Sequence, residues 1–169
     1  MKKVIILGSS RNNGDTKKIV SELLSRSDCD VIDLTEYNIS YFDYKHANQN
    51  DDFINLMKLI TDKYDVYIFA TPVYWYSMSG TMKVFFDRFT DLLHLEKGIG
   101  RKLRHKSMAV ISSSNGDNLG ADFWLPFKRS AEYLGMNYLA DLHTIAGKVE
   151  SDEIARFIEI IEMNDRENV

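Results

Sequence analysis

A segment suited to bind a phosphate group lies near the start of the chain, where Gly8–Thr16 reads GSSRNNGDT directly after the apolar run Lys3–Leu7. Its side-chain donors are three hydroxyls and one guanidinium, those of Ser9, Ser10, Thr16 and Arg11. Gly14 lets the backbone bend without a Cβ clash. The helix predicted to follow adds unpaired backbone N–H groups and the positive end of its dipole, and both favour an anion. The pattern therefore predicts a phosphate site between a strand and a helix.

The same segment argues against three familiar phosphate chemistries. A nucleoside-triphosphate loop requires Lys and then Ser or Thr after its second glycine, whereas Gly14 is followed by Asp15 and Thr16. A dinucleotide fingerprint, G-x-G-x-x-G, has a glycine where Ser10 stands. The segment contains no cysteine, which excludes a phosphatase-type thiolate nucleophile there.

Two further segments carry residues suited to a planar ligand. Thr71–Gly80 reads TPVYWYSMSG and holds three consecutive aromatic residues, while Ser112–Gly120 reads SSSNGDNLG and is small and polar. Aromatic side chains could form a wall for a flat aromatic ligand. Alternatively, the rings could cap the core or form a dimer contact. The polar segment could admit a planar ligand from the other side.

Strands and helices alternate along the sequence, and this order predicts how the three segments meet. Apolar runs predict strands at 3–7, 29–34, 65–70, 107–112 and 136–146. Helical spacing predicts helices at 16–26, from Asp51 or Asp52 through Ile60, at 79–94, at 121–134 with Gly135 as its C-terminal cap, and at 152–163. Continuous rather than alternating apolar strands indicate a parallel sheet covered on both faces. In such a sheet, ligands bind beyond the carboxyl ends of the strands, where all three segments would lie.

Composition narrows the class of protein further. The 169 residues are enough for one domain, which we expect to span 1–169, and the formal net charge of −4 gives no indication of nucleic-acid binding. Cys29 is the only cysteine, so an intramolecular disulfide and a cysteine-based metal site are excluded. The four histidines lack metal-ligand spacing, and we expect no bound metal. No stretch approaches the roughly 20 apolar residues that span a bilayer, so we expect a cytoplasmic protein without a membrane partner.

A phosphate at one end of a site and a planar heteroaromatic ring at the other describe FMN. The chain resembles the NADPH-dependent FMN reductase and NAD(P)H:quinone oxidoreductase family with a flavodoxin-like fold. The first segment resembles the family's G-S-x-R-x-x-G-x-T loop, and Pro72, Tyr74, Lys83 and Asp87-Arg88 resemble its P-x-Y…K…DR segment. The resemblance implies a three-layer α/β fold, a five-stranded parallel sheet of order 2-1-3-4-5, FMN with NADPH or NADH as electron donor, and a homodimer or a tetramer.

The resemblance, together with the residue types, predicts cofactor-binding residues in three groups. They are Ser9, Ser10, Arg11, Asn13, Gly14, Asp15 and Thr16; Pro72, Val73, Tyr74, Trp75, Tyr76 and Ser77; and Ser113, Ser114, Asn115 and Gly116. We assign no catalytic residue, because the cofactor carries the hydride chemistry and the protein supplies position and electrostatics. The expected function is transfer of hydride from NAD(P)H through FMN to a small acceptor such as a quinone, free flavin or an azo compound. The alternatives are a flavodoxin-like single-electron carrier and a non-enzymatic FMN-binding protein.

Some residues depart from the family pattern or have another expected role. Residues 35–52 contain no cysteine, which excludes the iron–sulfur version of the family. Asp15 stands where many members have Asn, and its carboxylate would either repel a phosphate or cap the helix. We expect Asp87 and Arg88 to form ion pairs rather than to perform chemistry. The basic run 101–106 is expected to be a solvated loop, with binding of a nicotinamide-nucleotide phosphate as the alternative.

Overall fold

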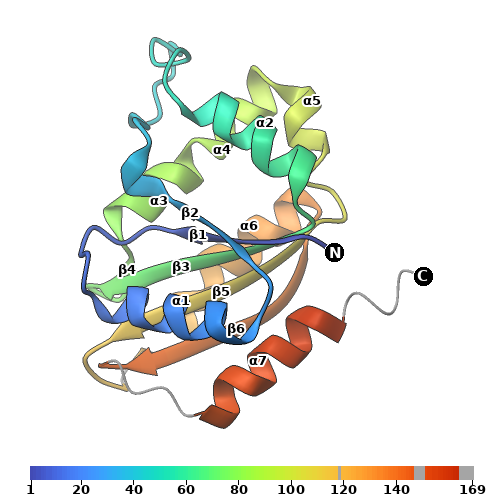
Figure 1. Cartoon of the computed structure of the whole chain (residues 1–169). Coiled ribbons are helices and arrows are strands. Elements are labelled where there is room, and N and C mark those ends of the chain that lie inside the picture. Colours follow the sequence, from blue (N-terminus) through green and yellow to red (C-terminus); the bar gives the residue numbers. More distant parts are fainter. Residues whose placement is uncertain (118, 147–150, 164–169) are drawn as a thin grey trace.

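The computed structural model describes residues 1–117, 119–146 and 151–163, and its centre is a sheet of five parallel strands (Figure 1). The strands are β1 (Lys3–Leu7), β2 (Asp30–Asp33), β3 (Val66–Tyr74), β5 (Ser107–Ser114) and β6 (Asn137–Ile145), in the spatial order β2-β1-β3-β5-β6. Counted along the chain, these five have the predicted order 2-1-3-4-5. All residues of β1 and the first six of β3 are buried, as their continuous apolar sequences predicted.

The prediction of only five strands was wrong by one short element. β4 (Ser77–Met78) pairs antiparallel with the end of β3, in the register Val73 opposite Met78 and Tyr74 opposite Ser77. The segment predicted to be a loop is therefore a hairpin. Its sequence contains none of the Asn-Gly or Asp-Gly pairs by which such a turn is recognised.

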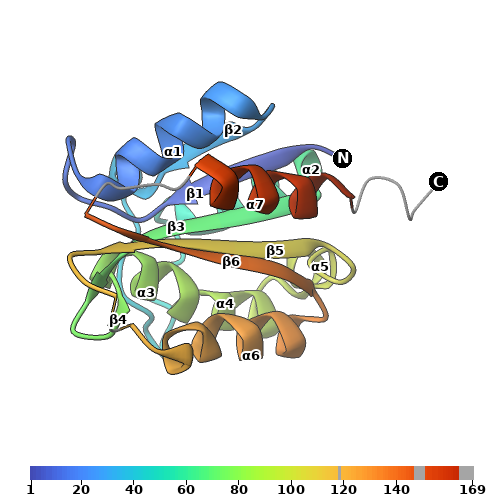
Figure 2. The same ribbon diagram turned by 90° about the horizontal axis from the view of Figure 1, so that it is seen from below.

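Helices cover both faces of the sheet, which confirms the three-layer α/β class (Figure 2). One face carries α1 (Asp15–Arg26) and α7 (Ser151–Met163), whose apolar residues join one core cluster with β1, β3 and β5. The other face carries α2 (Phe53–Lys63), α3 (Gly80–Asp87), α4 (Phe89–His94), α5 (Lys97–Arg101) and α6 (Leu125–Leu134). Two 3-10 turns, η1 (Leu34–Glu36) and η2 (Ala121–Trp124), follow β2 and precede α6. None of the helices in the described ranges has the length and apolar character needed to cross a membrane.

The predicted helix boundaries are correct in some places and wrong in others. Gly135 ends α6 with a φ of 71°, as predicted for a left-handed cap. The helix predicted over 121–134 begins as the 3-10 turn η2, and the helix predicted over 79–94 is divided at Arg88 into α3 and α4. Asp52 occupies the N-cap position of α2, while the carboxylate of its neighbour Asp51 accepts a hydrogen bond from the backbone N–H of Phe53 at 3.1 Å.

The helix divides at Arg88, whose side chain is completely buried and pairs with two carboxylates. Its Nε donates to Asp91 at 2.6 Å, and its other nitrogens donate to Asp51 and to the backbone oxygen of Ser40. The guanidinium also lies 4.8 Å from the centre of the Phe53 ring. Ser40 and Asp51 belong to the long connection between β2 and α2, so the hydrogen bonds of Arg88 attach that connection to the helical layer. The ion pair predicted for Arg88 is confirmed.

Candidate functional site

Three loops meet at the carboxyl ends of β1, β3 and β5 and enclose a cavity of about 160 Å³. The residues that line it are Ser9, Arg11, Gly14, Asp15, Thr16, Pro72, Val73, Tyr74, Ser113, Ser114 and Asn115. Every one of them belongs to the predicted cofactor-binding groups, and all three groups are represented. Ser10, Asn13, Trp75, Tyr76, Ser77 and Gly116 lie outside this lining, so their assignments stay predictions. The assignment of the lining residues to a cofactor is likewise a proposal.

Ser79 and Thr71 hold the first two loops together, although neither was predicted as part of the site. The hydroxyl of Ser79 donates to the backbone oxygen of Gly8 and accepts from the backbone N–H of Met82, so it also caps α3. The backbone N–H of Ser79 donates to Thr71 Oγ1 at 2.9 Å. A Cβ on Gly8 would lie 3.0 Å from Met82 Cβ, which is tighter than an ordinary contact, so glycine suits this close approach. A serine just before an apolar helix is a capping signal that could have revealed Ser79.

The loop between β1 and α1 presents donors that the protein itself leaves unused. Ser9 and Thr16 are buried residues with 2 % exposure each, and neither hydroxyl makes a hydrogen bond among the described residues. Within the same ranges, Arg11 has no carboxylate partner. Gly14 is the N-cap of α1 and supplies no side-chain acceptor for the first backbone N–H groups. Unpaired donors at the positive end of a 12-residue helix fit an anion such as a phosphate.

The carboxylate of Asp15, which lines the cavity, forms an ion pair with a lysine of the same helix. Lys18, one turn later on α1, places its Nζ 2.8 Å from Asp15 Oδ1. The neighbouring Lys17 pairs with Asp33 at the end of β2, also at 2.8 Å. Because the two lysines offset the two carboxylates, Asp15 opposes an anion less than its charge alone suggests. A carboxylate in the first turn of a helix is also favoured by the helix dipole.

The aromatic segment forms the tip of the β3–β4 hairpin at the rim of the cavity. Trp75 and Tyr76 occupy the two turn positions with φ of 51° and 61°, the left-handed values of a type I′ turn. Bulky side chains rarely adopt this conformation, which costs them about 1–2 kcal/mol per residue. The exposed fraction is 47 % for Tyr74, 94 % for Trp75 and 63 % for Tyr76. The interpretation that all three rings cap the core was therefore wrong, because the rings face solvent at the site.

His143 is a second contributor that the sequence did not reveal. It lies on β6, and its Nε2 is 2.8 Å from the hydroxyl of Ser114, which lines the cavity. Burial lowers the pKa of His143, and this effect outweighs the carboxylates of Asp117 and Glu153, which raise it. No local sequence signal marks this contact, because the two residues are 29 positions apart.

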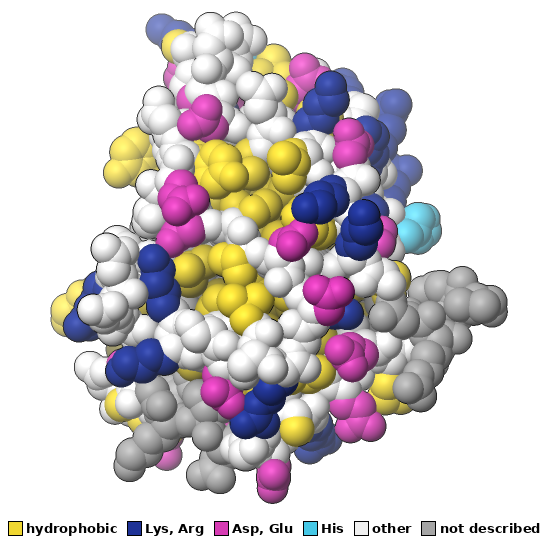
Figure 3. Space-filling view, in the orientation of Figure 1, with side chains coloured by type: hydrophobic (Ala, Val, Ile, Leu, Met, Phe, Trp, Pro, Cys, Tyr) yellow, Lys and Arg dark blue, Asp and Glu magenta, His cyan; other side chains and the backbone are white. Residues whose placement is uncertain are grey.

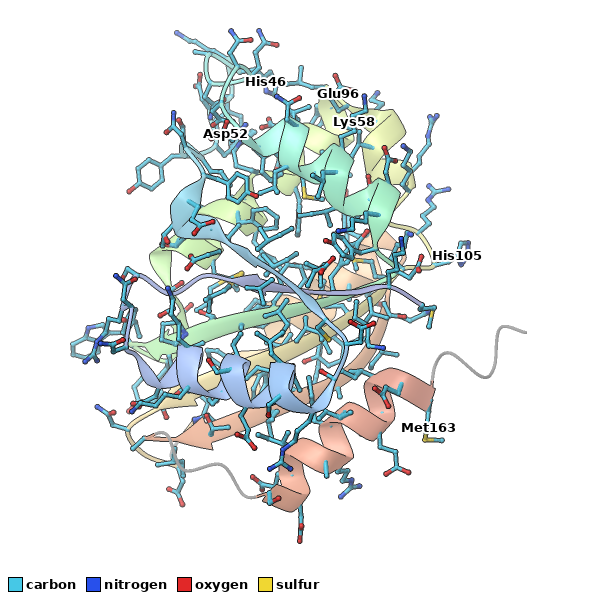
Figure 4. The ribbon with its side chains drawn as sticks, in the orientation of Figure 1. His46, Asp52, Lys58, Glu96, His105 and Met163 are labelled. Carbon is cyan, nitrogen blue, oxygen red and sulfur yellow. The ribbon has the colours of Figure 1, made fainter. Side chains whose placement is uncertain are left out.

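Other polar groups singled out in the sequence lie away from the cavity. His46 lies on the connection above α2, and His105 lies at the opposite end of the molecule from the hairpin (Figure 4). Lys and Arg side chains gather over α2 and α5 (Figure 3), where Lys102 pairs with Asp62 and Lys106 with Asp65. The basic run lies at the amino ends of the strands. A nucleotide phosphate bound there would therefore lie at the wrong edge of the sheet to share the cavity.

Comparisons with known proteins agree with this arrangement. The family model for NADPH-dependent FMN reductase matches residues 1–151. The Bacillus subtilis protein YwqN, whose name describes an NAD(P)H-dependent FMN-containing oxidoreductase, is 29 % identical over 148 residues, which cover 82 % of this chain and 81 % of YwqN.

Two solved structures show the same fold. The Trp repressor binding protein of Bacillus subtilis has a TM-score of 0.71 and 23 % identity, with coverage of 95 % of this chain and 97 % of that one. The NAD(P)H:acceptor oxidoreductase FerB of Paracoccus denitrificans has a TM-score of 0.68 and 18 % identity, with coverage of 98 % and 94 %. The flavodoxin-like architecture, the phosphate-type loop and the family match lead to one conclusion: the chain belongs to the NADPH-dependent FMN reductase family and is an NAD(P)H-dependent oxidoreductase with FMN as its cofactor.

Proposed function

We propose that the cavity at the carboxyl edge of the sheet is the FMN site and that its two ends hold different parts of the cofactor. The phosphate would bind the loop from Ser9 to Thr16, and the ring would lie between Pro72–Ser77 and Ser113–Gly116. Because about 160 Å³ is less than a whole nucleotide requires, the ring would lie partly outside the cavity, along the hairpin.

FMN, when bound, supplies the hydride chemistry. The chain's own residues hold and orient the cofactor. Arg11 offers a charged donor to the phosphate, and the Ser9 and Thr16 hydroxyls offer neutral ones. The Ser79 contacts to Gly8 and Thr71 keep the phosphate loop and the β3–β4 hairpin at a fixed separation. No side chain needs to act as a nucleophile or a general base in this proposal.

The observation that carries the proposal is the set of unused donors at the start of α1. Arg11→Ala removes the charged donor of that set, and hydrogen bonds to charged groups contribute about 1.5–3 kcal/mol. We therefore expect the Kd for FMN to rise about tenfold to a hundredfold, measured by quenching of flavin fluorescence. Arg129→Ala is the matched control, because Arg129 pairs with Glu132 on the exposed side of α6. Unchanged affinity in Arg11→Ala would remove the phosphate assignment.

We further propose that the acceptor is a small planar molecule such as a quinone, free flavin or an azo compound. Exposed aromatic rings at the rim of the cavity support this, because they offer stacking surfaces to a flat acceptor. The test is an anaerobic NADPH titration of the FMN-loaded protein, followed by its visible spectrum. Bleaching of the flavin absorption by one equivalent of NADPH, without the spectrum of a one-electron-reduced flavin, supports the two-electron enzyme. A screen of acceptors would then follow. A bound flavin that neither NADPH nor NADH reduces would instead support a single-electron carrier or a non-enzymatic FMN-binding protein.

We also propose that the enzyme is a cytoplasmic homodimer. The exposed aromatic residues of the hairpin support a protein contact near the cavity, because large apolar side chains are costly to leave in water. Light scattering of the purified protein distinguishes a dimer from a monomer or a tetramer.

A further inference from the structure

His143 connects the outermost strand of the sheet to the wall of the proposed flavin site. It lies on β6 opposite Ser112 of β5, and its Nε2 is 2.8 Å from Ser114 Oγ. Ser114 is the last residue of β5 and lines the cavity, together with Ser113 and Asn115. The imidazole therefore contacts the point where β5 ends and the wall of the cavity begins.

The hydrogen-bond partners of Ser114 determine which ring nitrogen of His143 carries the proton. The hydroxyl of Ser114 has one hydrogen, which it donates to the backbone oxygen of Gly116 at 2.7 Å. Ser114 Oγ can then only accept from His143, so Nε2 must be protonated. In the neutral imidazole, the proton is on Nε2 and Nδ1 is the free acceptor. His143 thus donates to Ser114, and Ser114 donates to the backbone oxygen of Gly116, in a continuous hydrogen-bond chain that ends on the turn after β5.

Charged groups approach His143 from three sides. Asp117 lies on the loop after β5, Asp141 lies on β6 itself, and Glu153 and Arg156 lie on α7. The last three line a groove of about 510 Å³ between β6 and α7, to which the imidazole also contributes. Protonation at acid pH adds a hydrogen to Nδ1 and leaves the Nε2–H bond to Ser114 in place. The contact with the cavity wall therefore exists in both charge states of the imidazole.

We propose that His143 is a positioning residue of the flavin site, whose Nε2–H fixes Ser114 and thereby the Ser113–Gly116 turn. The part of this inference that concerns the cofactor rests on the proposed function. The part that concerns the imidazole does not, since the hydrogen-bond chain is present in the protein alone.

The first test uses the protein without cofactor. Two-bond 15N–1H correlation spectra of the histidine rings at pH 8 should show His143 as the Nε2–H tautomer, assigned by its loss in His143→Gln. Ser114→Ala should return the His143 signals toward the averaged tautomer pattern of an exposed histidine such as His105. An Nδ1–H tautomer in the unaltered protein, or signals that Ser114→Ala leaves unchanged, would overturn the inference whether or not FMN binds.

The second test measures FMN affinity in variants that keep or remove the donor. His143→Gln retains an N–H near the position of Nε2, and we expect its Kd to stay within about twofold of the unaltered protein. His143→Met removes the donor, and loss of one hydrogen bond of ordinary strength should raise the Kd about threefold to tenfold. The double variant with Ser114→Ala should bind no more weakly than the weaker of the two single variants, because both remove the same bond.

His105→Met is the control, because His105 is exposed and lies at the far end of the molecule. Equal Kd values for His143→Met and the unaltered protein, or independent effects of His143 and Ser114, would refute the positioning role. Failure of the unaltered protein to bind FMN would instead refute the proposed function, and the tautomer measurement would still decide the role of the imidazole.

Discussion

Removal of the Arg88 side chain should destabilise the protein far more than a typical substitution. Arg88 is completely buried, and its two carboxylate partners, Asp51 and Asp91, have side chains only 5 % and 1 % exposed. Arg88→Met keeps most of the apolar volume and removes the cation. Both carboxylates would then lie in the interior without a compensating charge, except where His46 Nδ1 approaches Asp91 at 3.1 Å.

The size of the effect follows from these contacts. Breaking a buried ion pair by removing one partner costs about 3–5 kcal/mol, which is a large part of a total stability of about 5–15 kcal/mol. With a urea dependence of about 2 kcal/mol per molar, the unfolding midpoint should fall by about 1.5–2.5 M. Because Asp51 and Ser40 belong to the connection before α2, amide hydrogens there should exchange faster in Arg88→Met.

A triple variant separates the unpaired charges from simple loss of packing. Replacing Asp51 and Asp91 by Asn in the Arg88→Met background removes both buried charges, so this protein should be more stable than the single variant. Urea unfolding followed by circular dichroism at pH 7 measures all three proteins. The reasoning is refuted if Arg88→Met costs less than about 1 kcal/mol, or if the triple variant is no more stable than the single one.

The pH dependence of this cluster is a further check on the same reasoning. Burial alone would raise the pKa of Asp51, but hydrogen bonds from Arg88 and from the backbone N–H groups of Ser40 and Phe53 outweigh it and lower the pKa. The unaltered protein should therefore keep this stabilisation above the unfolded pKa of about 3.9 and lose it as the pH falls through the lower folded value. In Arg88→Met, the buried carboxylates lack their cation, so their pKa values rise above the unfolded value and their protonation restores stability before the pH has fallen to about 3.9. The stability difference between the two proteins should therefore begin to shrink above pH 4 and shrink further below it, where the unaltered protein loses its own stabilisation.

Three other perturbations have defined outcomes. Gly135→Ala places a Cβ on a residue with φ 71°, 3.3 Å from Arg104 Cγ, and should lower the free energy of unfolding in urea by about 1–2 kcal/mol. The control is Gly98→Ala, whose Cβ has no atom within 4 Å and which should be neutral or slightly stabilising. Equal effects of the two substitutions would contradict the strain argument. Trp75→Asn combined with Tyr76→Gly supplies the residues that a type I′ turn prefers. The melting temperature should rise, and turnover of planar acceptors should fall. A lower melting temperature would contradict the assigned turn. Burial lowers the pKa of His143 in the folded protein, so below about pH 6.5 this residue takes up a proton more readily in the unfolded chain. The free energy of unfolding should therefore decline as the pH falls below that value in the unaltered protein, and decline less in His143→Gln.

The sequence by itself determined the layered fold and the position of the site. Continuous apolar runs such as Val66–Ala70 predicted buried parallel strands, and the alternating helices required a sheet covered on both faces. Because parallel strands end at one edge, loops 8–16, 71–80 and 112–120 could be placed together before any contact was known. Gly135 was also predictable, since a left-handed helix cap depends on one residue and its immediate neighbours.

Only the tertiary structure decided which distant side chains pair. Arg88 and Asp51 are 37 positions apart, and His143 and Ser114 are 29 apart, so neither contact leaves a local pattern. The break between α3 and α4 falls at Arg88, whose partners the local sequence does not reveal. The Trp75–Tyr76 turn accompanies the pairing of β4 with β3, against the local preference of both residues. The spacing of apolar residues indicates which face of a helix or strand is apolar. It does not indicate the register between strands, and that register brings an imidazole on β6 within hydrogen-bond distance of a serine on β5.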